Sequence, residues 1–448
     1  MRTLEVRSIM LQAGFAKCAI TPPPGLRMGG YRRRREPASG VHDPLTANCL
    51  VVSDGQQRVA FVVLDLISLF ADTVAAIKTA VAEATGMDAA QCLVTCTHTH
   101  SGPDTIFLSG GGEAVTAWCR GLPRTVAALV QQAIAVQRPV QVSVSRCAID
   151  DVAWNRRLLM RDGTVRLNLE AVNPAEIKAR GPVDPTATIV VFEDGETVVG
   201  MLVNFTLHPA VLGEENLMYS RDFPGVAVDA IRNRHPDQPQ VLFLNGAFGD
   251  INHVKTPGEW IATFAEAERI GNRIAEAVVP AIGRRCRVAA EPLSVTRKMV
   301  ALERRPAPFA DIEAANREIE RLTDALREAP APEAAALRYE LSFAEETRDV
   351  MMANDACVAE IQVIRMGGIE VIGVPGELFV EDGLDLKRAD PQRHSLIAGN
   401  ANGYIGYLPL ARSFAEGAYE TRFGRTSCLV PEAGSIVVDE INRLRGLK

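Results

Sequence analysis

Short apolar runs alternate with helix-period patterns over most of the chain between Ala47 and about residue 300. The runs are rich in Val, Ile and Leu and lack regular polar positions, which is typical of strands buried on both faces. Between the second and third runs, apolar residues recur at helical spacing up to Gly86, which predicts a helix. The expected strands are 49–53, 59–66, 91–97, 141–149, 187–194, 197–207 and 240–247, and the other expected helices are 116–136, 227–234 and 260–282.

This order of elements predicts an α/β fold with a mixed β-sheet core and helices on both faces. Asp194-Gly195 lies between two apolar runs and predicts a tight hairpin, so some neighbouring strands are expected to be antiparallel. The strand pattern resumes late in the chain, with a hairpin expected around Gly367-Gly368 and a strand beginning at His394. We expect a single domain that spans residues 1–448.

The segment 305–350 differs from the rest of the chain. It is rich in Ala, Glu and Arg and has a Pro-Ala-Pro break at 330–332, which predicts two exposed helices. We interpret it as a helical insertion packed on the main body. A lid and a contact between subunits of a homo-oligomer are the alternatives.

The composition and net charge of the chain indicate which classes of partner it could bind. With 47% hydrophobic residues, 23% charged residues and a net charge of −7, the chain is typical of soluble globular proteins and lacks the basic excess of nucleic-acid binders. The one basic cluster, Arg32–Arg35, predicts a solvated loop, with an anion-binding patch as the alternative. No apolar run approaches the ~18–20 residues of a membrane span, and the N-terminus lacks the layout of a signal peptide. We therefore expect a cytoplasmic protein that acts on a small molecule.

The nine cysteines are scattered along the chain, and no two of them have CxxC spacing. In a cytosolic protein this pattern indicates reduced thiols. A zinc site built from cysteine is therefore not expected.

Residues with metal-binding side chains follow several of the expected strands. His98 and His100 end a strand in VTCTHTHSGP, His208 ends another in MLVNFTLHP, and Glu377 follows a third in GVPGELF. Residues i and i+2 share one face of a strand, so both rings of the pair can point into one pocket. A histidine pair, a distant third histidine and a carboxylate are the ligand types of a catalytic zinc site with an open position.

A fourth loop, NANGYIGYLP, adds Tyr404 and Tyr407. Each candidate also has a structural explanation. His208 alone would more often be a hydrogen-bonded structural residue, Glu377 could cap the helix that follows it, and the tyrosines could pack with a wet hydroxyl. His253 is a candidate pocket residue without an assigned role. The coincidence of four such loops favours a metal site.

Six motifs follow one another along the chain: THTHSGP, Asn155-Arg156, NFTLHP, NGAFGDINH, PGELF, and NGYIGYLP with AYE after it. In this order they resemble the catalytic domain of the neutral/alkaline ceramidase family. Members of that family are zinc-dependent amidases that cleave the N-acyl bond of ceramide. The resemblance covers about residues 11–430, which is nearly the whole chain.

The resemblance implies a zinc-dependent hydrolase with one Zn²⁺ per chain. Carried over by position, the zinc ligands are His98, His208, Glu377 and Tyr407. Tyr407 is preferred to Tyr404 because its spacing to the later Ala-Tyr-Glu resembles the family pattern.

The resemblance also implies residues that act on the substrate. His100, Arg156 and Tyr419 match family positions that contact the substrate or the developing oxyanion, and His100, free of the metal, is the expected general acid. Asn252 stands where the family has a serine, so we expect it at the catalytic site in that serine's place. Since the chain stops at Lys448, we expect the family's C-terminal β-sandwich domain to be absent.

These expectations define a reaction. Zinc lowers the pKa of a bound water to about 7, which supplies a nucleophile for an amide carbonyl. The replaced serine, the absent export signal and an aromatic content of 5% favour a small soluble amide as substrate. The alternatives are a true ceramidase, a zinc-dependent lactonase or esterase, and a non-catalytic binding protein. The last is disfavoured because all four implied ligands are present.

Overall fold

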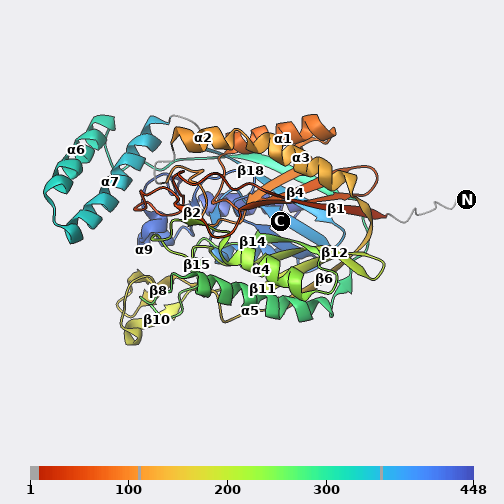
Figure 1. The fold of residues 1–448 in the computed structure, drawn as a ribbon. Helices are drawn as coiled ribbons and strands as arrows, with labels where there is room; N and C mark the ends of the chain where they lie inside the picture. Colours follow the sequence, from red (N-terminus) through yellow and green to blue (C-terminus); the bar gives the residue numbers. More distant parts are fainter. Residues whose placement is uncertain (1–9, 109–111, 354–356, 448) are drawn as a thin grey trace, which may run out of the picture.

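The computed structural model describes residues 10–108, 112–353 and 357–447 and contains two large β-sheets with helices around them (Figure 1). The larger sheet has nine strands in the order β14-β12-β11-β6-β1-β3-β4-β5, with β16 paired to β6. Its strands are β1 (Leu11–Ala19), β3 (Thr46–Ser53), β4 (Arg58–Leu64), β5 (Cys92–Cys96), β6 (Arg138–Ala148), β11 (Thr186–Asp194), β12 (Thr197–Phe205), β14 (Gln240–Asn245) and β16 (Cys286–Arg287).

Two strand pairs of this sheet are parallel, β4 with β5 and β12 with β14. A parallel pair needs a crossover connection, and the helices α1 (Ala71–Thr85) and α4 (Asp222–Arg234) provide one for each pair. The other neighbours are antiparallel, including the hairpin at Asp194 that joins β11 to β12. The prediction of a mixed sheet is therefore confirmed.

The second sheet has the order β17-β18-β19-β21 and was not distinguished in the sequence from the first. It contains the predicted hairpin at Gly367 between β18 and β19, and a parallel pair, β19 with β21, joined through α8. These elements are β17 (Ser294–Leu302), β18 (Cys357–Met366), β19 (Ile369–Gly373), α8 (Val380–Ala389) and β21 (His394–Ala398).

Alternation along the strands separates the core into layers. In β4, Val62 packs toward α1 and α3 (Leu122–Ala135), whereas its neighbour Val63 packs between the two sheets. Strands of the other half of the sheet pack in the same way against α4 and α5 (Phe264–Ile282), and α8 and α10 (Ala433–Arg445) cover the outer face of the second sheet. Helices therefore cover the sheets from outside, as Figure 1 shows for α1, α3, α4 and α5.

The remaining helices refine the sequence predictions. The expected helix over 116–136 is interrupted at Gly121, so that α2 (Glu113–Cys119) precedes α3. The insertion consists of α6 (Ile312–Glu328) and α7 (Ala331–Met352), which project together from one end of the molecule in Figure 1. All nine cysteines are free thiols. In the part of the chain that the structure describes, no helix is both long and apolar enough to span a bilayer.

Candidate metal centre and active site

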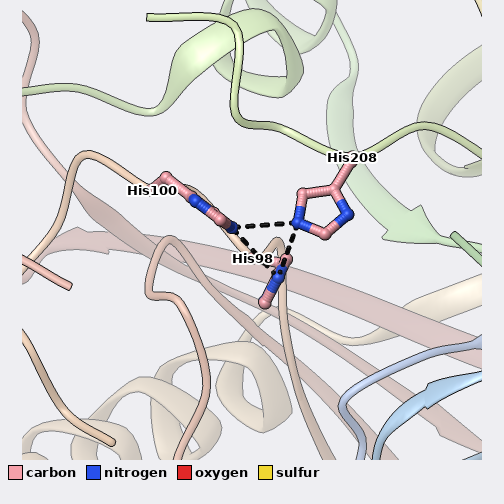
Figure 2. A group of neighbouring side chains, drawn as sticks. All are labelled: His98, His100 and His208. Atoms are coloured by element: carbon pink, nitrogen blue, oxygen red, sulfur yellow. Dashed lines mark hydrogen bonds between the residues drawn. The ribbon is translucent and has the colours of Figure 1, made fainter. Parts of the chain in front are cut away.

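Three buried histidine rings point their Nε2 atoms at one another (Figure 2). The Nε2–Nε2 distances are 3.1 Å from His98 to His208, 3.2 Å from His98 to His100 and 3.0 Å from His100 to His208. Two nitrogens bound tetrahedrally to one zinc at ~2.0–2.1 Å lie about 3.3 Å apart. Each of these distances is therefore close to the separation of two nitrogens that share one ion.

Glu377 lies beside this triangle. Its Oε2 is 3.5 Å from Nε2 of His98 and 3.9 Å from Nε2 of His208, and it accepts no hydrogen bond from any residue that the structure describes. Its Oε1 accepts a hydrogen bond of 2.7 Å from the hydroxyl of Tyr404. A buried carboxylate oxygen without a donor is costly, and a cation among the nitrogens would satisfy it. The donor set thus fits a metal ion.

Strand ends bring these residues together. His98 lies two residues beyond β5 and His208 three residues beyond β12, both in the larger sheet. Glu377 begins the short strand β20 (Glu377–Leu378), which pairs in parallel with β22 (Tyr407–Leu408) and sets Glu377 opposite Tyr407. His98 has a φ of 71°, in the left-handed region, so a turn rather than a shared strand face brings its ring toward His100.

Hydrogen bonds orient the ring of His98, and burial keeps the rings of His100 and His208 neutral. Nδ1 of His98 lies 2.6 Å from the carbonyl oxygen of Ile67 and 2.7 Å from the side-chain amide of Asn400. Since a carbonyl oxygen only accepts, the tautomer with its proton on Nδ1 donates to Ile67 and presents the lone pair of Nε2 to a ligand. Burial, with the neighbouring His98 ring, lowers the pKa of both His100 and His208 well below the ordinary value. Neutral imidazole is the form that binds metal.

The tyrosines contact the site in different ways. Tyr404 makes the hydrogen bond to Glu377, whereas Tyr407 lies next to Glu377 through the β20–β22 pairing. The rings of Tyr407 and Tyr419 meet edge to face with centroids 5.9 Å apart. Burial raises the pKa of each of these tyrosines, so all three hydroxyls are protonated in the metal-free protein.

Arg156 is held in place by a buried ionic network. Its Nε donates to Oε1 of Glu420 at 2.9 Å, and its Nη2 donates to the carbonyl oxygen of Gly249. Its guanidinium lies 4.9 Å from the ring centroid of Tyr419 and 5.6 Å from that of Tyr407, within cation–π range. Arg156 is therefore a rigid donor beside the tyrosines.

Asn252 has a mainly structural set of partners. It exchanges two side-chain hydrogen bonds with Asn168, of 2.9 Å and 2.8 Å, and its Oδ1 also accepts from the amide of Val254 at 3.0 Å. The next residue, His253, is buried edge-on against Trp260 with centroids 5.4 Å apart and does not line the cavity described next.

One cavity of about 640 Å³ unites the predicted site. All eight predicted residues line it, namely His98, His100, Arg156, His208, Asn252, Glu377, Tyr407 and Tyr419. Apolar side chains such as Ile67, Leu108, Leu169 and Trp260 form much of the remaining wall, as is usual for a small-molecule site, and Arg32, Arg33, Glu214 and Glu215 add charged groups to it. The predicted residues, which come from distant loops, thus lie around one cavity.

Two contributors, Phe248 and Tyr31, were not expected from the sequence, and Tyr404 was considered there only as the alternative to Tyr407 as a metal ligand. Tyr404 orients Glu377, Phe248 packs 4.8 Å from the ring of His98, and Tyr31 meets His100 edge-on at 5.0 Å. Phe248 could have been found, because it lies inside the NGAFGDINH motif. Tyr31 had no comparable signal, because it precedes the arginine run that was interpreted as a solvated loop.

Comparison with known proteins gives a consistent result. Residues 11–301 match the family described as Neutral/alkaline non-lysosomal ceramidase, N-terminal. The chain is 23% identical over 467 aligned positions to a protein named Neutral ceramidase from Mycobacterium tuberculosis (strain ATCC 25618 / H37Rv), covering 89% of this chain and 71% of the relative.

Two solved structures share the fold. The crystal structure of neutral ceramidase from Pseudomonas aeruginosa superposes with a TM-score of 0.74 at 19% identity, over 98% of this chain and 75% of that one. A structure described as Ceramidase complexed with C2 gives a TM-score of 0.71 at 18% identity, over 98% and 76% of the two chains. Because the family match spans more than half of the sequence, the chain belongs to the neutral/alkaline non-lysosomal ceramidase family, whose members hydrolyse an amide C–N bond.

Proposed function

We propose that this protein is a zinc-dependent amidohydrolase that cleaves the amide bond of a small soluble substrate. The observation that carries the proposal is the convergence of three Nε2 atoms beside Oε2 of Glu377, which accepts no hydrogen bond from the described residues. Zinc is the ion that such a nitrogen and carboxylate donor set favours. The ligands we propose are His98, His208, Glu377 and Tyr407.

A zinc ion in this position supplies Lewis acidity and generates a nucleophile from water near neutral pH. We assign His100 to the substrate side of the site, as the general acid that protonates the leaving amine. Its ring lines the cavity, and the loop that contains Gly30 and Tyr31 packs against it and fixes its orientation.

Arg156 and Tyr419 are the proposed donors to the substrate carbonyl oxygen. Fixed donors in a buried site stabilise a developing oxyanion without having to reorganise. Glu420 holds the guanidinium of Arg156, and the ring of Tyr419 packs on that guanidinium. In this proposal Asn252 borders the substrate, and its side-chain amide is hydrogen-bonded to that of Asn168.

Ceramide N-deacylation is the second candidate. Family membership and the name of the relative from Mycobacterium tuberculosis support it, and so do the apolar walls of the cavity. Both candidates use the same residues and differ only in the group that the cavity accepts.

The test combines metal analysis with a substrate series. Purified protein is analysed by mass spectrometry for bound metal and assayed on amides from acetyl to long-chain acyl, including a short-chain fluorescent ceramide, with and without chelator. We expect near-stoichiometric zinc and chelator-sensitive hydrolysis that is fastest on small amides; faster hydrolysis of the ceramide would favour the second candidate. Absence of metal, with unchanged behaviour of His98→Ala and His208→Ala, would contradict both. The cytoplasmic location and the single-domain organisation stay predictions.

A further inference from the structure

The helical insertion contributes directly to the cavity that contains the histidines. Ala335, Ala336 and Tyr339 of α7 line the same cavity of about 640 Å³ as His98 and Glu377. Positions i, i+1 and i+4 lie on one side of a helix, so these three residues form a continuous strip. The insertion is therefore part of the wall of the site.

A buried ion pair attaches α7 to the main body. Glu346 of α7 is 5% exposed and accepts both Nε and Nη2 of Arg32, at 2.7 Å and 3.1 Å. The same Nη2 donates to the hydroxyl of Thr426 at 2.7 Å, and the backbone amide of Arg425 donates to Glu346 at 3.1 Å. A bidentate pair of this kind fixes both distance and direction.

Aromatic contacts add a second attachment. The ring of Phe343, one turn before Glu346, has the guanidinium of Arg32 at 4.4 Å and that of Arg422 at 3.9 Å from its centroid. Tyr339 packs edge-on against Phe343 with centroids 5.1 Å apart. Tyr339 is therefore held in the wall and does not move freely in solvent.

The arginine run that attaches α7 also packs on the histidines. Arg34 is 3% exposed, and its Nη2 donates to the backbone carbonyl of His100 at 2.6 Å. Gly30 has a φ of 106°, and a Cβ at this position would lie 2.5 Å from the His100 ring. The expectation that Arg32–Arg35 is a solvated loop is thus wrong for Arg32 and Arg34, because these two side chains join α7 and the histidine loop into one unit.

We propose that α7 is the specificity-determining wall of the cavity. The side chains at 336 and 339 limit how far an apolar substrate group can extend from the metal centre. Apolar side chains of the cavity, including Leu169 and Trp260, offer such a group a surface to lie on, and the small side chains of the two alanines leave room in the α7 wall. The inference rests on the proposed function, because the apolar substrate group that meets α7 is taken to be the acyl part of the amide. Because α7 lines the cavity, the insertion is more than a solvated appendage.

Binding of unreactive ligands tests the wall without requiring catalysis. Straight-chain carboxylates from butanoate to tetradecanoate are titrated by calorimetry into the full-length protein and three variants. Affinity is expected to rise about fourfold per added methylene until the chain meets α7, and then to stop rising. Ala336→Trp should move this limit to a shorter chain, and Tyr339→Ala should move it to a longer one.

Arg338→Trp is the matched control, because Arg338 is an exposed position of the same helix and does not line the cavity. It should leave the limit where it is in the unmodified protein. Thermal unfolding of all variants verifies that they fold. An identical limit in all four proteins, or affinities that do not depend on chain length, would overturn the proposal.

Amide hydrolysis, measured on the same proteins, separates this inference from the proposed function. A shifted limit in carboxylate binding without any hydrolysis would refute the amidohydrolase and leave the wall intact. Hydrolysis whose dependence on acyl length is the same in Ala336→Trp and Arg338→Trp would support the enzyme and refute the wall.

Discussion

The hydroxyl of Tyr404 donates a hydrogen bond of 2.7 Å to Oε1 of Glu377 and leaves Oε2 of the same carboxylate facing the histidines. Partners of this kind set the direction of a metal-binding carboxylate, and their loss typically weakens metal affinity about 10–100-fold. We expect Tyr404→Phe to weaken zinc binding by about this factor, as measured by competition with a chelator of known affinity. The loss should exceed that of Tyr419→Phe, because Tyr419 makes no hydrogen bond to Glu377. Equal affinities of the two variants would show that Tyr404 does not orient the carboxylate.

The two histidines of the THTH motif are predicted to differ in function. His98→Ala should lose bound zinc, whereas His100→Ala should keep it and lose at least about 100-fold in kcat, which is the usual size of a general-acid contribution. Metal content by mass spectrometry, together with kcat, distinguishes the two variants. Nε2 of His100 lies only 3.0–3.2 Å from Nε2 of His98 and of His208, so His100 is close enough to be a ligand itself. Loss of zinc in His100→Ala would add His100 to the ligands.

We expect His253 to make the free energy of unfolding depend on pH. Its two ring nitrogens are buried without a hydrogen-bond partner among the described residues, and burial lowers its pKa to about 4. Above pH 6.5 the ring is neutral in both the folded and the unfolded protein. As the pH falls from 6.5 to 4, the unfolded chain takes up a proton that the folded chain does not, so the free energy of unfolding should fall by about 3 kcal/mol.

Denaturant unfolding of metal-free protein between pH 4 and pH 7 measures this dependence. His253→Phe keeps the packing against Trp260 without a titrating group and should flatten the curve by that amount. Parallel curves for the two proteins would assign the pH dependence to other groups.

Glu420 is expected to be important for both stability and rate. It is fully buried and accepts from Arg156 at 2.9 Å and from Arg157 at 3.2 Å. Removing one partner of a buried ion pair typically costs about 3–5 kcal/mol, because the remaining charges lose their compensation. Glu420→Ala should therefore lower the free energy of unfolding by about this amount.

Glu420→Gln, which keeps the shape of the side chain, should lower kcat more than it raises KM, because Arg156 is then held less firmly. The control is Glu416→Gln, since Glu416 also pairs with Arg157 but its side chain is 31% exposed. Pairs of that type usually contribute at most about 1 kcal/mol. Similar losses in the Glu420 and Glu416 variants would argue against a role of burial.

Local sequence was sufficient for the types of most elements and for the histidines and Glu377 of the cavity. Strand ends are recognisable because the apolar run stops and a polar ligand type follows, as at His98, His208 and Glu377. The roles of the two tyrosines were harder to predict, because Tyr404 and Tyr407 lie three residues apart in one loop. Their directions depend on backbone turns at Gly403 and Gly406, with φ of 141° and 90°, which sequence spacing does not reveal.

The insertion shows the same limit. Its composition predicted two helices, and α6 and α7 are present at those positions. That α7 forms a wall of the site follows from contacts such as Arg32 with Glu346, which lie 314 positions apart in the chain. Such a pair leaves no local pattern, because its energy depends only on how the folded segments are arranged.

The sequence by itself determined most of the strands and helices, which residues could hold a metal, and the family to which the chain belongs. These properties depend on local periodicity, on side-chain chemistry and on the order of short motifs. Only the tertiary structure decided that the strands form two stacked sheets and that the rings of His98, His100 and His208 meet beside Glu377. The physical reason is that the local pattern of apolar and polar residues indicates which positions are buried, whereas the contact between distant loops depends on the packing of the whole core.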